Sequence, residues 1–122
     1  MDTGVLISVD RDEEHSRVFL TAAHRAGESL HTSEAVVAQV WRDGARQARL
    51  ASVLKGLHVH PLDDGRAVGR LLAMAGGADV VDAHLVVLGA VLCQPILTGD
   101  AEDLRALAAP IGRAGPAILS WP

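Results

Sequence analysis

The sequence contains very few aromatic and sulfur-containing side chains. It has no tyrosine, one phenylalanine, two tryptophans and a single cysteine, Cys93, among 122 residues. One cysteine excludes an internal disulfide, and the apolar stretch around Cys93 predicts a small buried side chain. The longest apolar run, residues 85–93, is far shorter than the roughly 20 residues of a membrane span, and no basic signal-peptide segment begins the chain. We therefore expect a cytoplasmic protein without membrane contact.

Positive charge is also scarce. The 11 lysines and arginines are outnumbered by 15 aspartates and glutamates, which gives a net charge of −4. No overall basic field favours nucleic acid, so any RNA contact would depend on a local basic patch or on metal ions. Apolar residues make up 49% of the chain and are mostly aliphatic, which excludes a disordered protein and suits strands packed between helices. This length predicts one domain, residues 1–122.

Short apolar runs alternate with longer helical patterns along the chain. Strands are predicted at residues 29–32, 57–62, 95–98 and 117–121, whereas residues 5–9 are either extended or the start of a helix. Helices are predicted at residues 11–26, 33–51 (as one or two helices), 64–75, 79–93 and 101–108. Strands that alternate with helices indicate an α/β fold with a mostly parallel sheet.

Acidic residues fall where predicted strands are followed by helices. They are Asp2, Glu34, Asp79, Asp82, Asp100 and Asp103. One explanation is structural, because Asp79 with Asp82, and Asp100 with Asp103, occupy positions that cap helix starts. Glu34 near a helix start is equally explained as a solvated charge. The other explanation is functional, because ligands of open parallel sheets bind outside the carboxyl ends of the strands.

Several carboxylates at one sheet edge would repel one another unless a divalent cation neutralised them. Mg²⁺ and Mn²⁺ prefer oxygen ligands, and two such ions about 4 Å apart can activate a water and stabilise the leaving oxygen of a phosphodiester. The six histidines are scattered and there is no paired-cysteine motif, so no zinc pattern competes. The acids therefore predict a Mg²⁺ or Mn²⁺ site.

Three motifs, in order, resemble those of PIN-domain ribonucleases, the toxins of bacterial VapBC toxin–antitoxin pairs. Residues 2–7 (DTGVLI) are similar to the opening motif of that family. Residues 79–86 (DVVDAHLV) resemble its third acidic motif, with Asp82 in the principal position. Residues 97–104 (LTGDAEDL) resemble the closing motif, and the similarity covers nearly the whole chain.

The resemblance implies a three-layer α/β sandwich and an endoribonuclease that hydrolyses RNA with a metal-activated water, without a covalent intermediate. It implies that Asp2, Asp82 and Asp100 are metal ligands, that Asp79 and Asp103 assist them, and that Thr98 forms a hydrogen bond within the site. It also implies a homodimer that a small antitoxin protein inhibits.

The sequence departs from the family at the second acidic position, where Gln39 stands in place of a glutamate. Either Glu34 or Asp43 supplies the missing carboxylate, or Gln39 contributes a neutral oxygen and the metal binds more weakly. Glu34 is slightly favoured, because a helix-start position lies nearer the sheet edge. A second departure is that only Met1 precedes Asp2, where the family has a central strand. We hypothesise that about four to six further residues, the length of a short strand, precede Met1.

Basic and histidine residues offer weaker signals. Arg42, Arg46 and Arg49 have the spacing of one helical stripe, which would be either a phosphate track that positions substrate or a solvated face. His84 follows Asp82 closely and would either approach substrate or serve structure. His58 and His60 share a strand face, but a third metal ligand is missing nearby.

Two other functions remain open from the sequence. A catalytically degenerate PIN-like module would bind RNA or protein without cleavage, and Gln39 and the missing strand favour it. A metal-dependent phosphatase or flap-type DNA nuclease would use the same carboxylates, but the chain is too short to contain an insertion that threads the substrate.

Overall fold

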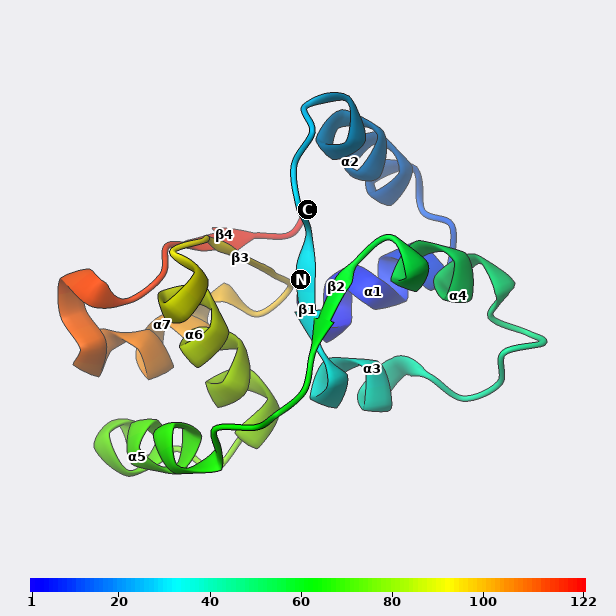
Figure 1. Ribbon diagram of the computed structural model, residues 1–122. Coiled ribbons are helices and arrows are strands. Elements are labelled where there is room, and N and C mark those ends of the chain that lie inside the picture. The colour runs from blue at the N-terminus through cyan, green and yellow to red at the C-terminus, as the bar shows by residue number, and fades with distance from the viewer.

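The computed structural model describes all residues, 1–122, and shows helices and short strands alternating along the chain (Figure 1). The strands are β1 (His31–Ser33), β2 (His58–His60), β3 (Ile96–Thr98) and β4 (Ile118–Ser120). The helices are α1 (Thr3–Asp10), α2 (Glu14–Arg25), α3 (Glu34–Val40), α4 (Ala48–Lys55), α5 (Gly65–Ala75), α6 (Val80–Leu92), α7 (Ala101–Ala108) and the 3₁₀ helix η1 (Ala109–Ala114). The α/β class is confirmed.

The strands form two separate parallel pairs. In one pair β1 lies beside β2, and in the other β3 lies beside β4. The parallel direction is as predicted, but one continuous sheet is not observed. The backbone hydrogen bonds that link the pairs come from the first two residues: the Met1 nitrogen donates to the His31 carbonyl at 3.0 Å, and the Asp2 amide donates to the Leu97 carbonyl at 3.2 Å. Figure 1 shows the chain start, labelled N, between the two pairs.

Polar side chains cap the starts of several helices, as was predicted for Asp79. Asp2 accepts from the Val5 amide at 3.1 Å, Ser33 from the Ala35 amide at 3.0 Å, and Asp79 from the Asp82 amide at 3.1 Å. Each bond pairs a backbone N–H that the first turn of a helix leaves without a partner. Because the Asp2 cap begins α1, residues 5–9 are helical, and the extended alternative is wrong.

Buried aliphatic side chains from most helices and from β3 form one cluster. Its buried members are Met1, Val5, Leu6, Val9, Val36, Val40, Leu50, Val68, Leu71, Ala83, Leu85, Val86, Ile96, Leu104, Leu107 and Ala108. Each large member contributes about 1.5–3 kcal/mol when fully buried. No single helix is long and apolar enough to cross a membrane; α5 and α6 pass that test only as a pair, bent by 107° at the break between them.

The expectation that Cys93 is buried is wrong. Cys93 ends α6 in a left-handed backbone conformation, with φ 53°, and its side chain is exposed. This conformation turns the chain out of the helix towards β3, so the residue lies outside the apolar face that precedes it.

Candidate metal centre

The Asp2 carboxylate joins the start of α1 to the end of β3. One oxygen, Oδ1, accepts from the Val5 amide, while Oδ2 accepts from the Thr98 hydroxyl and, at 3.1 Å, from the Gly99 amide. Asp2 is only 6% exposed. Because each carboxylate oxygen has two lone-pair directions, Oδ1 keeps one that no protein donor uses. Asp2 is therefore fixed in place and can still bind a cation.

Thr98 connects Asp2 to Asp100. The Thr98 side chain is fully buried, and its hydroxyl donates to Asp2 while accepting from the Asp100 amide at 2.9 Å. Gly4 lies beside Gly99, and a Cβ on Gly4 would be in ordinary van der Waals contact with the Gly99 Cα at 3.5 Å. The turn after β3 is thus held against the start of α1 by one hydroxyl and one carboxylate.

Asp79 and Asp82 lie at the start of α6. Asp79 caps the helix through the Asp82 amide, as the structural explanation predicted, and Asp82 occupies the first turn. The pKa of the half-buried Asp82 carboxyl is raised to about 6, first by burial and then by the negative charges of Asp79, Asp2, Asp100 and Asp103. Asp82 thus lies within electrostatic reach of each of the other four carboxyl groups.

Asp100 and Asp103 lie at the start of α7. Asp100 occupies the N-cap position, but its side chain accepts no capping bond from the helix. The pKa of Asp103 is raised, mainly by the Asp100 charge and by a hydrogen bond between the two carboxyl groups, with smaller effects of burial, Glu102 and Asp79. The capping explanation therefore fails for Asp100, whose carboxyl group instead faces another acid.

No basic side chain neutralises these acids. We call Asp2, Asp79, Asp82, Asp100 and Asp103 the acidic cluster from here on. The ion pairs of the molecule are His15–Glu13, Arg17–Asp12, Arg46–Asp43 and Arg49–Asp12, and none of them includes a member of the acidic cluster. Its repulsion can be relieved only by protons, by solvent ions or by a bound cation.

The acidic cluster fits Mg²⁺ or Mn²⁺ in its donor atoms, which are all carboxylate oxygens. Its side chains do not surround a common point closely enough for three of them to hold an ion as they stand. Mg²⁺ is usually bound in proteins by only one or two carboxylates, with waters and substrate phosphates completing its shell. Asp79, Asp100 and Asp103 are exposed to solvent.

Of the three residues considered for the second acidic position, Gln39 forms a side-chain hydrogen bond with a neighbour of Asp2 in the chain. The Thr3 hydroxyl donates to Gln39 Oε1, which joins α3 to the residue after Asp2. Asp43 lies in the loop after α3, where its carboxylate accepts from the Ala45 amide at 3.0 Å and pairs with Arg46 at 3.8 Å. Glu34 is exposed and does not contribute to the raised pKa of Asp82, so the preference for Glu34 has no support.

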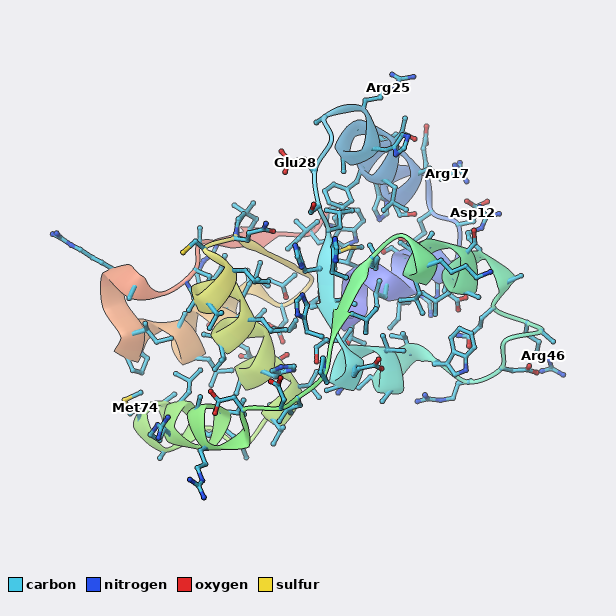
Figure 2. The ribbon with its side chains drawn as sticks, viewed as in Figure 1. Asp12, Arg17, Arg25, Glu28, Arg46 and Met74 are labelled. Atoms are coloured by element: carbon cyan, nitrogen blue, oxygen red, sulfur yellow. The ribbon has the colours of Figure 1, made fainter.

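The predicted arginine stripe is wrong, because residues 41–47 interrupt the helix. The buried Gln47 side chain closes this loop: its Oε1 accepts from the Arg42 amide at 2.7 Å, and its Nε2 donates to the Val40 carbonyl at 2.8 Å. Arg42 turns back to donate to the Trp41 carbonyl at 2.6 Å. Figure 2 shows Arg46 on the outer edge of the loop, pointing into solvent. The sequence signal that was missed is Asp43-Gly44, a common turn dipeptide.

The histidines form two arrangements, in which His84 takes the structural one of its two alternatives and His31 joins the predicted pair His58 and His60. His84 is 3% exposed, and its Nδ1 lies 2.6 Å from the Ser33 hydroxyl, so it ties α6 to the end of β1 rather than approaching substrate. His31 joins His58 and His60 on the β1–β2 pair, with its Nδ1 2.8 Å from His60 Nε2 and its ring centroid 4.8 Å from that of His58. These three imidazoles do not surround a common point as metal ligands would.

The relation of this site to known enzymes depends on the three sequence motifs. Compared with protein-family models and with curated proteins, the chain gives no match to either.

Proposed function

We propose that this chain is a Mg²⁺- or Mn²⁺-dependent endoribonuclease of the PIN type, the toxin of a toxin–antitoxin pair. The observation that supports this most is the acidic cluster, which brings together carboxyl groups from the starts of α1, α6 and α7 without a basic partner. The three motifs resembling PIN domains contain all five of these residues. The parallel direction of both strand pairs is compatible with the three-layer sandwich of that family.

Asp2, Asp82 and Asp100 would hold the ion, and Asp79 and Asp103 would assist. When bound, a divalent ion lowers the pKa of a water and neutralises charge that develops on a phosphodiester. The chain itself keeps Asp2 in one orientation through Thr98 and Gly99, and this preorganisation lowers the cost of assembling the site. Burial keeps Asp82 partly protonated near pH 6, so its proton must leave before a cation binds.

The partners are also part of the proposal. The substrate is RNA, a small antitoxin protein blocks the site, and two copies of the chain form a dimer. Because the net charge of the protein is −4, attraction of the RNA phosphates must come from a local group of basic side chains or from the bound cation. Arg42 and Arg46 are both exposed in the loop that follows Gln39 and are the candidates for phosphate contacts, from a loop rather than from a helix.

The experiment is an RNA cleavage assay with single-stranded and structured RNAs, in Mg²⁺, in Mn²⁺ and in EDTA. Asp82→Asn removes one charge from the acidic cluster and is expected to lower cleavage at least 100-fold. The matched control is Asp64→Asn, which changes a helix-capping carboxylate outside the cluster whose Oδ1 accepts from the Ala67 amide at 3.2 Å. Asparagine caps helices about as well as aspartate, so this control is expected to keep full activity. Cleavage that persists in EDTA or in Asp82→Asn would refute the proposal.

Gln39 favours one alternative, the catalytically degenerate module. A neutral amide at this position weakens cation binding, and a protein that binds RNA without cutting it would be the result. The cleavage assay, together with a filter-binding measurement, distinguishes the two functions. The degenerate module binds RNA on the filter but gives no cleavage product under any metal condition. Gln39→Glu is then expected to restore cleavage.

A further inference from the structure

Two polar side chains, Ser33 at the end of β1 and His84 early in α6, are buried against each other. Ser33 is 0% exposed and His84 is 3% exposed, and the Ser33 hydroxyl lies 2.6 Å from His84 Nδ1. The same hydroxyl accepts from the Ala35 amide at 3.0 Å, so one oxygen both caps α3 and contacts α6. Burial of a polar group is costly unless it has a partner, and here each of the two groups is the partner of the other.

This bond gives the start of α6 a directional contact with another element. The remaining hydrogen bonds of α6 stay within the helix or join it to the residues directly before and after it, so no other one reaches a different helix or strand. Apolar packing of Ala83, Leu85 and Val86 holds the helix in the core, but apolar contacts are not directional. The Ser33–His84 bond therefore limits the rotation of α6 and its shift along the helix axis.

Asp82 lies on the same turn of α6 but on the opposite side of the helix. Residues two apart in an α-helix are separated by about 200° around the axis, so His84 points towards β1 while Asp82 points away from it. Three donors orient the Asp2 carboxylate, whereas the Asp82 carboxylate accepts no hydrogen bond from the protein. The position of the Asp82 carboxylate therefore depends on how α6 is placed.

Strand β1 also holds the chain beside Asp2. Thr32, which is 1% exposed, donates from its hydroxyl to the Met1 carbonyl at 2.8 Å, and the His31 carbonyl accepts from the Met1 nitrogen at 3.0 Å. Successive side chains of a strand point to opposite faces, so Thr32 and Ser33 bond in opposite directions. β1 thus lies between the two acids, bonded to the residue before Asp2 on one face and to α6 on the other.

We propose that Ser33 and His84 are positioning residues: through their bond, β1 sets the separation of the Asp2 and Asp82 carboxylates, and with it the affinity of the acidic cluster for its cation. They act through Asp82, and neither of them contacts the cation or the substrate. The inference rests on the proposed cation-dependent function and assigns His84 a role in it. Replacing groups that orient metal ligands from outside the coordination shell typically weakens metal binding by roughly 10–100-fold.

The test measures the Mn²⁺ dissociation constant by calorimetry at pH 7.5, with circular dichroism to show that each variant is folded. Ser33→Ala and His84→Leu remove the same bond from its two ends, and each is expected to weaken Mn²⁺ binding about tenfold. The double variant is expected to weaken it no further, because either single change already removes the bond. His84→Leu keeps the Ser33 cap of α3, so it tests the bond even if Ser33→Ala does not fold.

Two controls separate positioning from stability. His84→Asn keeps an acceptor, because the amide oxygen of asparagine lies as far along the side chain as Nδ1, and it is expected to retain the affinity of the unchanged protein. Ser16→Ala removes another buried hydroxyl, which is on a residue 2% exposed and donates to the Glu13 carbonyl at 2.6 Å. This change is expected to lower stability while leaving the Mn²⁺ dissociation constant unchanged.

If the unchanged protein binds Mn²⁺ and both single variants bind it equally well, the inference is overturned while the proposed function stands. Losses that multiply in the double variant would also overturn it, because the two residues would then act separately. A tenfold loss in Ser16→Ala would overturn it too, since affinity would then follow stability alone. Absence of Mn²⁺ and Mg²⁺ binding by the unchanged protein would refute the proposed function, and the inference with it.

Discussion

Replacing Thr98 by valine isolates the bond that orients Asp2. Valine has almost the shape of threonine, so the change removes one hydroxyl from a fully buried position with little change in packing. The lost hydroxyl leaves an Asp2 oxygen without one of its donors and the Asp100 amide without its acceptor. A hydrogen bond to a charged group is worth about 1.5–3 kcal/mol, and an unpaired group adds to the cost. The free energy of unfolding is therefore expected to fall by about 2–4 kcal/mol.

The control is Thr32→Val, a second buried threonine, which is 1% exposed. The Thr32 hydroxyl donates to the Met1 carbonyl at 2.8 Å, which is a neutral acceptor. Its loss is expected to cost about 1 kcal/mol. Thr98→Ser keeps the hydroxyl and is also expected to cost about 1 kcal/mol, because only a methyl group is removed.

Urea denaturation followed by circular dichroism measures these differences, since the change in midpoint multiplied by the slope gives the loss of stability. Thr98→Val is expected to lower the free energy of unfolding by at least about 1 kcal/mol more than Thr32→Val does. Equal losses in the two valine variants would show that the bond to the Asp2 carboxylate contributes no more than a neutral one. Asp2 would then not be held by Thr98, and the preorganised site would lose its basis.

Three further predictions concern the acidic cluster and the packing beneath it. The pKa of Asp82 is raised to about 6, so its proton competes with a cation below that pH. Mg²⁺ affinity measured by calorimetry should therefore rise between pH 5 and pH 7 and level off above pH 7. Asp82→Asn should flatten this pH dependence. Gln39→Glu should strengthen Mn²⁺ binding about tenfold at pH 7.5, and an unchanged dissociation constant would show that Gln39 lies outside the metal shell. Gly89→Ala should lower the free energy of unfolding by about 1–3 kcal/mol, because a Cβ at position 89 would lie 2.8 Å from the Pro116 Cβ. If urea titration instead gives the stability of the unchanged protein, the segment that contains Pro116 can shift to make room for the methyl group.

Local signals predicted the elements well because four helix starts, those of α1, α3, α5 and α6, contain their own polar cap. Ser33 and Asp79 bond to amides two and three residues later, so their roles can be read from neighbouring residues. The ends of the helices are equally local: Gly76 ends α5 with φ 72°, a conformation that glycine adopts readily. The hydrophobic pattern of α7 predicted both of its boundaries, residues 101–108.

Contacts between distant residues could not be predicted in this way. The bond from Thr98 to Asp2 spans 96 positions, and the bond between His84 and Ser33 spans 51. Nothing near His84 in the sequence distinguishes a buried structural imidazole from one that faces substrate. The loop that Gln47 closes was missed for a different reason, since the apolar spacing across it fits a helix while Asp43-Gly44 indicates a turn. The turn prevails because one buried amide pairs three backbone groups.

The helix-capping aspartates show how a structural residue differs from a candidate metal ligand. Asp64, Asp79 and Asp100 all stand at the N-cap position of a helix, so helix capping is a possible explanation for each of them from the sequence. Asp64 makes its capping bond away from the acidic cluster, so capping accounts for its charge completely. Asp79 caps its helix and also raises the pKa of Asp82, while Asp100 makes no capping bond and instead faces Asp103. Asp100, which makes no capping bond and lies beside another acid, is therefore the helix-start aspartate that fits the proposed cation site better than it fits a capping role.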